Sequence, residues 1–303
     1  MLATFLHDLS PFLFEIRPGI GPRWYGFSYV LSFVLGFLLY RWLAVRRYTE
    51  MPPEKVGDFI TWAALFGVML GGRIGWMIFY GAHQDHTGDP WWWPLEVWKG
   101  GMSSHGGILG LVLFTLYYAR KHKVSWTSIG DSLCVVAPIG LFLVRCANFI
   151  NGELFGKVAG PPGGPATIPW PVAFPTELGD AMPSLDVIQK DEAVRQALLD
   201  TLPPRHPSQI YEALLEGVVL FAILWFLRTR CRVPRGVITG AFFILYAALR
   251  IIGEIYRVPD PAWSVGQISA GQFLSIFLFV IGGAFLVWGW RTQRYEVAVQ
   301  ART

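Results

Sequence analysis

The sequence predicts an all-α polytopic membrane protein, and its composition is the first reason. Of the 303 residues, 53% are hydrophobic and only 15% are charged, with a mean hydropathy of +0.42. A soluble chain carries more charge than this. The second reason is that several apolar runs reach about 20 residues, the length that crosses a ~30 Å hydrocarbon core. The third is that Lys and Arg collect in alternate connecting loops.

Seven apolar runs are candidate transmembrane helices. The third is the shortest, and the second and sixth contain charge, so six or eight spans are the alternatives. Together the runs predict one transmembrane domain that covers residues 1–303. They lie at residues 24–45, 57–80, 105–119, 128–150, 209–227, 236–256 and 267–290.

The distribution of basic residues predicts the orientation of the chain in the membrane. Most of the 25 Lys and Arg follow the first, third and fifth runs or end the chain. Short cytoplasmic loops retain an excess of positive charge, so the N-terminus is expected outside and the C-terminus inside. The net charge of +4 is then explained by loops beside an anionic leaflet, and nucleic acid is not an expected partner.

Residues 157–207 form the only long connection, between the fourth and fifth runs, and predict a small head on the outer side. Its Pro- and Gly-rich first half excludes a long regular element. In its second half, Ser184 is positioned to cap a short helix that ends before Pro203. The head is either a tether or a surface that guides a partner. Residues 1–22 lack the basic start of a signal peptide, so we expect them along the outer interface.

Three arginines lie inside the apolar runs: Arg73, Arg145 and Arg250. Each needs an anionic partner, because a charge at the centre of a span costs roughly 2.5 to 3.5 kcal/mol on insertion scales. Such residues indicate a functional site, and three of them favour a negatively charged ligand. The alternative for Arg73, which lies in GGRIG, is a role in close helix packing.

The predicted orientation places polar residues from six runs at one depth, near the outer headgroups. On the sixth run, Tyr246, Arg250, Glu254 and Arg257 share one helical face. An ion pair between Arg250 and Glu254 that only joins helices is the alternative to a ligand site. The other polar residues at this depth are Tyr25, Arg73, His105, Arg145, Asn148, Tyr211, Glu212 and Glu216.

Six motifs resemble the bacterial prolipoprotein diacylglyceryl transferase family, in the family's order and over nearly the whole chain. The chain departs from the family pattern at Val144, where a glycine is usual before the arginine of the fourth motif. The motifs are RWYG (23–26), GGRIG (71–75), SHGGILG (104–110), RCANFINGELFG (145–156), HPSQIYEALLEG (206–217) and LRIIGEIYRVPD (249–260).

The resemblance implies a transferase of the bacterial inner membrane that moves the diacylglyceryl group of phosphatidylglycerol to the lipobox cysteine of a preprolipoprotein signal peptide. A thioether forms and glycerol phosphate leaves. It also implies seven spans, a periplasmic N-terminus, a cytoplasmic C-terminus, an active site near the periplasmic leaflet, and no metal or other cofactor. It implies functional roles for Tyr25, His105, Arg145, Asn148, Glu153, Gly156, Tyr246, Arg250 and Glu254.

The reaction needs the chemistry that these residues carry. Negative charge grows on the departing phosphate, and the guanidiniums of Arg145 and Arg250 are suited to bind it by two parallel hydrogen bonds. The thiol attacks as thiolate, so we expect His105 to act as the base that removes its proton. Glu254 would orient Arg250. The remaining residues are expected to bind substrate, together with Arg73 and Arg257, which the charge pattern adds.

Two other classes of protein are compatible with buried arginines. A transporter for an anionic solute would use them as a binding ring, but transporters usually hold their site near the midplane between repeats, and no repeat is visible. A non-catalytic scaffold would use all polar residues to join helices. It does not explain why they share one depth.

The expected role of His105 can be tested by His105→Gln. The change should slow transfer while lipid binding stays largely intact, because a glutamine cannot accept the thiol proton. Single-turnover kinetics and a separate lipid-binding measurement distinguish the two effects. Lost lipid binding with normal single-turnover chemistry would make His105 a recognition residue instead.

Overall fold

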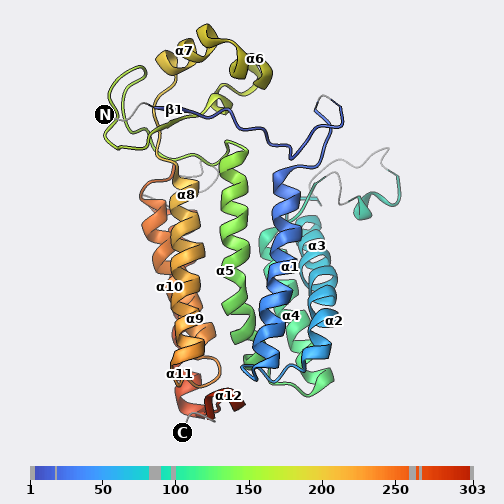
Figure 1. Cartoon of the computed structure of the whole chain (residues 1–303). Coiled ribbons are helices and arrows are strands. Elements are labelled where there is room, and N and C mark those ends of the chain that lie inside the picture. The colour runs from blue at the N-terminus through green and yellow to red at the C-terminus, as the bar shows by residue number, and fades with distance from the viewer. Residues whose placement is uncertain are drawn as a thin grey trace. The chain divides into compact units, whose positions relative to one another are not determined.

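The structure, a computed structural model, describes residues 4–17, 19–81, 90–96, 100–258, 264–265 and 268–300. It is mainly helical (Figure 1). The chain divides into two compact units, each described by itself. The first comprises Met1–Gly36, Cys134–Cys231 and Val237–Arg291, and the second comprises Phe37–Leu133, Arg232–Gly236 and Thr292–Thr303.

Six helices in the described part of the chain are long and apolar enough to cross a membrane, which confirms an all-α polytopic membrane protein. The predicted third span is also a helix, α4 (Ser104–His122), but it is not one of these six. Its last turn carries three basic residues, so its composition is less apolar. The six are Trp24–Val45, Pro53–Phe79, Trp126–Ile150, Ser208–Arg230, Val237–Glu254 and Ser275–Thr292.

Two of these spans, Pro53–Phe79 and Ser208–Arg230, are built from more than one element. Each contains a seven-residue π-helical stretch, η2 or η7. The elements of the spans are α1 (Trp24–Val45), η1 (Pro53–Lys55), α2 (Val56–Trp62), η2 (Ala63–Met69), α3 (Leu70–Phe79), α5 (Trp126–Ile150), α8 (Ser208–Glu212), η7 (Ala213–Val219), α9 (Leu220–Arg230), α10 (Val237–Glu254) and α11 (Ala270–Thr292). Short elements outside them are η4 (Trp93–Leu95), β3 (Ser264–Val265), β4 (Ile268–Ser269) and α12 (Val297–Gln300).

In the second unit, α4 runs antiparallel to η2 and α3 along a seam of glycines. A Cβ atom added at Gly71 would lie 2.8 Å from the Cα of Gly110, and one at Gly75 would lie 2.6 Å from the Cα of Gly106. Only glycine allows two backbones to approach this closely. The close helix contact predicted from GGRIG is therefore present.

In the first unit, α10 packs against the span formed by α8, η7 and α9. On its other side it meets α11, where a Cβ at Gly240 would lie 2.7 Å from the carbonyl oxygen of Gly282. The rings of Phe243 and Phe285 stack beside this contact, with centroids 6.2 Å apart. These contacts fix the helix that carries Arg250.

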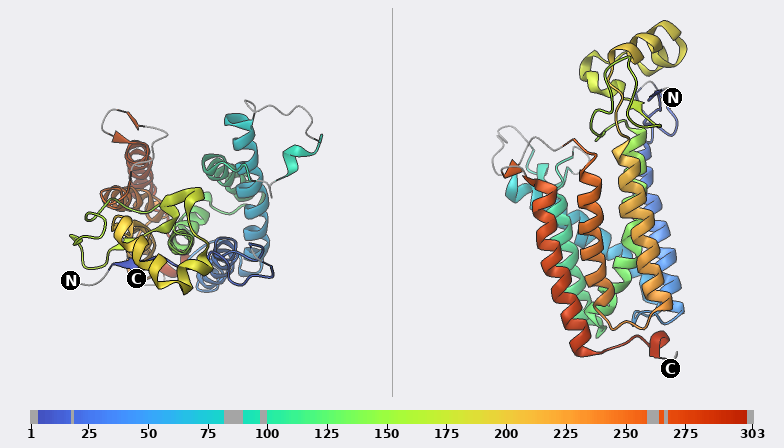
Figure 2. Two further views of the ribbon diagram at one scale, coloured as in Figure 1. Left: turned by 90° about the horizontal axis from the view of Figure 1, so that it is seen from above. Right: turned by 90° about the vertical axis from the view of Figure 1, so that its left-hand side faces the viewer.

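The head lies beyond one end of the helices of the first unit, as both views of this region show (Figures 1 and 2). Its strand β2 (Val172–Ala173) pairs in parallel with β1 (Phe5–Leu6). The N-terminal segment, expected only to lie along the interface, thus contributes a strand to the head. A small core closes around Leu6, Ala173, Ile188, Leu198 and Leu202.

The second half of the head contains two short helices where one was predicted. They are α6 (Leu185–Lys190) and α7 (Glu192–Thr201), and η6 (Pro175–Ala181) precedes them. Ser184 is at the N-cap position of α6, but its side chain makes no capping bond. The helix breaks because Asp191 adopts an extended backbone conformation and its carboxylate accepts bonds from the N–H groups of Ala193 and Val194 instead.

The glycine seam predicts a sharp difference between two neighbouring substitutions. A Cβ at Gly106 would lie 2.4 Å from the Gly71 carbonyl oxygen, whereas one at Gly107 meets Val68 at an ordinary 3.4 Å. Gly106→Ala should therefore lower the free energy of unfolding by an overpacking cost of about 1–3 kcal/mol. The thermal unfolding midpoint of the purified protein should fall as a result. Gly107→Ala is the matched control and should leave the midpoint nearly unchanged. Equal midpoints for the two variants would contradict the packing described.

Candidate active site

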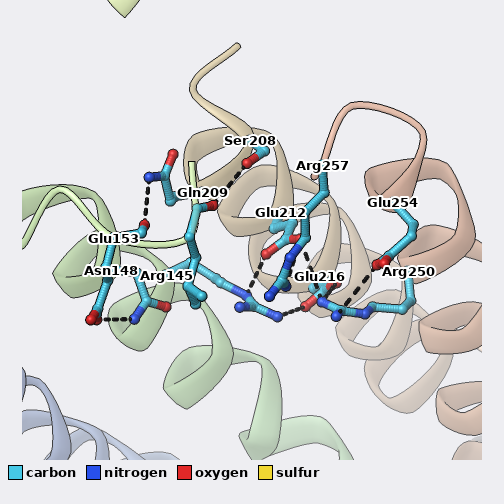
Figure 3. Close-up of polar contacts among 11 residues, drawn as sticks. Arg145, Asn148, Glu153, Ser208, Gln209, Glu212, Glu216, Arg250, Glu254 and Arg257 are labelled. Atoms are coloured by element: carbon cyan, nitrogen blue, oxygen red, sulfur yellow. Dashed lines mark hydrogen bonds and ion pairs between the residues drawn. The ribbon is translucent and has the colours of Figure 1, made fainter. Parts of the chain in front are cut away.

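A cluster of arginines and glutamates lies inside the helices of the first unit (Figure 3). Arg145 comes from α5, Glu212 and Glu216 come from the span of α8 and η7, and Arg250 comes from α10. The two glutamate side chains are almost completely buried, with exposed fractions of 2% and 0%. Buried carboxylates of this kind require cationic partners.

Arg145 and Arg250 share both of these carboxylates. The Nε of Arg145 lies 2.9 Å from Oε2 of Glu212, and its Nη2 lies 3.3 Å from Oε2 of Glu216. The Nη1 of Arg250 lies 3.4 Å from Oε1 of Glu212 and 3.3 Å from Oε1 of Glu216. The guanidiniums therefore face each other across the carboxylates, as Figure 3 shows.

Two further charged residues complete the cluster. Nη1 of Arg257 lies 3.4 Å from Oε1 of Glu212, and Nη2 of Arg250 lies 3.5 Å from Oε2 of Glu254. The pair between Arg250 and Glu254 expected from the sequence is thus present, but it is one of several contacts of Arg250. Three arginines face three glutamates, so the formal charges of the cluster balance.

Tyr246 lies one helical turn before Arg250 on α10. Its hydroxyl interacts electrostatically with the charged groups of the cluster, which are those of Glu216, Arg250, Arg145 and Glu212. The residues of the sequence-predicted stripe on this helix therefore face the same group of charges.

Glu212 and Glu216 are the members of the cluster that were not among the predicted site residues. Their spacing of four residues puts both on one face of their span. The signal for them was in the sequence: permanent cations in lipid need anions, and these are two carboxylates within an apolar run. Which arginine each one meets depends on how the helices pack, which residue spacing does not give.

The loop after α5 is fixed to the start of the next span beside the cluster. The amide of Asn148 donates to Oε1 of Glu153 at 2.7 Å, and the side chain of Gln209 donates to the backbone carbonyl of Glu153, also at 2.7 Å. The hydroxyl of Ser208 donates to the carbonyl of Leu154 at 3.1 Å. The predicted residues Asn148 and Glu153 thus contact each other, and Gln209 and Ser208 hold their loop in place.

Gly156 lies where three segments of the first unit meet. Its N–H donates to the carbonyl of His206 at 2.9 Å, and the next N–H, of Lys157, donates to the carbonyl of Tyr256 at 2.8 Å. A Cβ at Gly156 would lie 2.5 Å and 2.6 Å from those two oxygens, so the position requires glycine. Burial lowers the pKa of His206, and the charge of Lys157 lowers it further, so both favour the neutral imidazole.

Arg205 connects this junction with the head. Its Nη1 donates to the carbonyl of Gly156 at 3.0 Å, and its Nη2 donates to Oε2 of Glu177 at 2.8 Å. Its guanidinium also lies over the ring of Phe155, 4.7 Å from the centroid. The head is therefore joined to the loop that carries Glu153 and Gly156.

Arg73, in the second unit, binds backbone carbonyls. Its Nε donates to Pro94 at 2.7 Å, its Nη2 donates to Trp93 at 2.8 Å, and its Nη1 donates to Gly100 at 2.9 Å and Gly101 at 3.1 Å. These bonds use the fork of the guanidinium to hold a loop. They favour the structural alternative for Arg73 over a role in substrate binding.

Two other predicted residues lie outside the cluster's contacts. His105 is exposed in the first turn of α4, in the second unit, and Ser103 caps this helix by accepting a bond from the N–H of Gly106 at 3.3 Å. Tyr25, in the first unit, has its hydroxyl 3.2 Å from that of Tyr29. Among the residues that the structure describes, no group of three or more His, Cys, Asp or Glu is arranged to hold a metal ion.

The apolar helices and the buried cluster define a membrane protein with an arginine-rich polar site. The chain belongs to the prolipoprotein diacylglyceryl transferase family, whose model matches residues 11–288. It is similar to proteins named phosphatidylglycerol--prolipoprotein diacylglyceryl transferase. One from Shigella boydii is 39% identical over 96% of this chain and 97% of its own length. One from Bdellovibrio bacteriovorus is 34% identical over 93% of each chain.

The shared carboxylates predict a large effect of Glu212→Gln on stability. Glu212 contacts Arg145, Arg250 and Arg257, and the loss of one partner of a buried ion pair typically costs about 3–5 kcal/mol. The thermal unfolding midpoint of the purified variant should fall accordingly. Asp186→Asn is the control, since Asp186 and Lys190 form an exposed pair with side chains 71% and 75% exposed, and it should change the midpoint little. A midpoint unaltered by Glu212→Gln would refute the pairing.

Proposed function

We propose that this protein transfers the diacylglyceryl group of phosphatidylglycerol to the lipobox cysteine thiol of a preprolipoprotein signal peptide, with release of glycerol phosphate. The similar proteins carry the name of this activity, and the chain belongs to their family. The supporting structural observation is that Arg145 and Arg250 are held by the same two carboxylates within membrane-spanning helices. A polar lipid headgroup is the anion that a membrane supplies to such a place.

The reaction explains why arginines are needed there. The sulfur of the thiolate forms a bond to the glyceryl carbon, and the bond from that carbon to the phosphate oxygen breaks. The bonding electrons leave with the phosphate, so its negative charge increases. Guanidiniums that already point at this position stabilise the transition state without having to reorganise. The described contacts of Arg145 use Nε and Nη2, which leaves its Nη1 donors for a phosphate oxygen.

We assign the remaining roles as follows. His105 removes the thiol proton, and Glu254 orients Arg250. Arg257, Glu153 and Gly156 bind or shape the substrate site, whereas Arg73, which the charge pattern had added to it, holds the backbone of a loop. Neutral hydrogen bonds to headgroup oxygens come from Tyr25, Asn148 and Tyr246. The proposed reaction requires no metal or other cofactor.

We also propose that α4 is a seventh span. A helix of 19 residues is about 28 Å long, close to the thickness of the hydrocarbon core. In the second unit it runs beside the span Pro53–Phe79, from the contact of Gly106 with Gly75 to that of Leu111 with Gly67. A helix that follows a membrane span this closely shares its depth.

Seven spans and the basic loops together support one arrangement in the bacterial inner membrane. The N-terminus is periplasmic and the C-terminus is cytoplasmic, within a single transmembrane domain that covers residues 1–303. The head, residues 157–207, is then periplasmic, and the arginine cluster lies near the periplasmic leaflet. In this position the head can guide the signal peptide, because Arg205 joins it to the loop of Glu153 and Gly156.

The proposed activity is tested by a direct assay. Purified protein is incubated with phosphatidylglycerol and a lipobox peptide, and the peptide is analysed by mass spectrometry. The expected result is a mass increase of one diacylglyceryl group and the appearance of glycerol phosphate. A peptide with alanine in place of its cysteine is the control and should stay unmodified. An unmodified cysteine peptide under conditions where the protein is folded would reject the proposal.

The role of the arginines predicts a split between turnover and lipid affinity. Arg145→Lys or Arg250→Lys keeps the charge but loses the planar fork, so turnover should fall roughly 10²- to 10³-fold, the effect of losing one donor to developing charge. Lipid affinity should fall less. Arg195→Lys is a matched control, because Arg195 pairs with Asp8 in the head. Equal losses of turnover and affinity would indicate uniform binding instead.

A further inference from the structure

Two adjoining grooves lie on the second unit, at the end of α4 opposite to His105. The first, of about 470 Å³, lies between α4 and the span of α2 and η2, and Trp62, Phe66 and Phe114 contribute to its wall. The second, of about 490 Å³, is a shallow open groove along α4 itself, because all of its lining residues, which include Leu113 and Leu116, belong to this helix. About 25 Å of helix separates this end from His105, so the grooves are not part of the proposed active site.

One pair of residues lines both grooves. Tyr117 and Lys121 are one helical turn apart, and the ammonium group of Lys121 lies over the Tyr117 ring, 5.5 Å from its centroid. The tyrosine is 57% exposed, so its ring is accessible from outside the unit. The two grooves therefore meet at a single cation that is held by an aromatic side chain.

Positive charge is concentrated at the same end of both grooves. Lys55 and His122 line the first groove together with Lys121, and Arg120 lines the second. The one acidic residue in the lining of either groove is Asp58. With His122 neutral, each groove keeps a net positive charge.

The apolar parts of the grooves lie deeper in the span than the charges. On α4, Leu113 precedes Lys121 by about two turns, and on the neighbouring span Phe66 follows Lys55 by about three turns. Because the two helices are antiparallel, these residues lie on the same side of the cations. Trp62 and Phe66 stack with centroids 5.4 Å apart and are 46% and 52% exposed, which makes an aromatic wall open to lipid.

We infer that the two grooves form a binding site for one anionic diacyl phospholipid. Its phosphate binds at Lys121 and Lys55, and one acyl chain lies in each groove. Charge complementarity selects an anionic headgroup, and the meeting of two apolar grooves at one cation matches the branching of a diacylglycerol. In the proposed orientation this lipid belongs to the cytoplasmic leaflet, and it is distinct from the lipid substrate.

The test measures lipids retained by the purified full-length protein in native mass spectrometry, with dioleoyl phosphatidylglycerol as the probe. The double variant Lys55→Gln/Lys121→Gln should retain about one lipid fewer than the unmodified protein, with affinity for that lipid lowered roughly tenfold or more. Lys55→Arg/Lys121→Arg should retain it. Arg41→Gln/Arg230→Gln removes two exposed charges outside the grooves and is the matched control, so it should bind like the unmodified protein.

Several outcomes would overturn the inference. Equal retention by the Lys55→Gln/Lys121→Gln variant and the unmodified protein would mean that these lysines only extend toward the headgroup region. Equal losses in both glutamine variants would mean that binding depends on total charge alone. Equal retention of dioleoyl phosphatidylcholine by the unmodified protein would remove the requirement for an anion. Transfer activity at saturating phosphatidylglycerol should be unchanged in the double variants, which separates this test from that of the proposed reaction.

Discussion

The sharing of Glu212 and Glu216 between Arg145 and Arg250 is the interaction on which the polar interior depends. Both guanidiniums lie in apolar spans and are stabilised by these anions, and neither carboxylate could remain buried at 2% and 0% exposure without a cation. Because each carboxylate meets arginines from α5 and α10, the pairs also fix three spans of the first unit relative to each other. The same contacts that stabilise the helices aim the arginines at a common place. If these arginines act as proposed, the stability of the fold and the transfer reaction depend on the same side chains.

The balance of charge in the cluster has a chemical meaning for the proposed reaction. Three arginines and three glutamates leave no large excess of positive charge that would trap a phosphate ion. Affinity must then come from the geometry of hydrogen bonds, which favours the oxygens whose charge increases during the reaction. The glutamates also restrict the long arginine side chains, so less conformational entropy is lost when a ligand binds.

The sequence was sufficient to predict most of the helices and much less of the side-chain pairing. The length of the apolar run alone predicted both ends of α1, Trp24–Val45, because the thickness of the membrane sets that length. The sequence did not predict the break in the head at Asp191. There the aspartate carboxylate binds backbone N–H groups that a continuous helix would bond to its own carbonyls. For the site, the expectation of anionic partners for Arg145 and Arg250 was correct, but their identity depends on helix packing. An anionic partner was expected for Arg73 as well, but its guanidinium binds backbone carbonyls of a loop. The pattern of residues does not predict which backbone acceptors a loop will supply.

The two π-helical stretches, η2 and η7, share a construction. Each has a glycine at its fifth position, and each of these glycines is close to a neighbouring helix: Gly67 to Leu111 and Gly217 to Phe142. A π-helix turns less per residue than an α-helix. If the seven residues of η7 were wound as an ordinary α-helix, the preceding turn would be rotated relative to α9, and Glu212 would no longer face α10. The winding of this segment is therefore under as strict a constraint as the identity of the residues it presents.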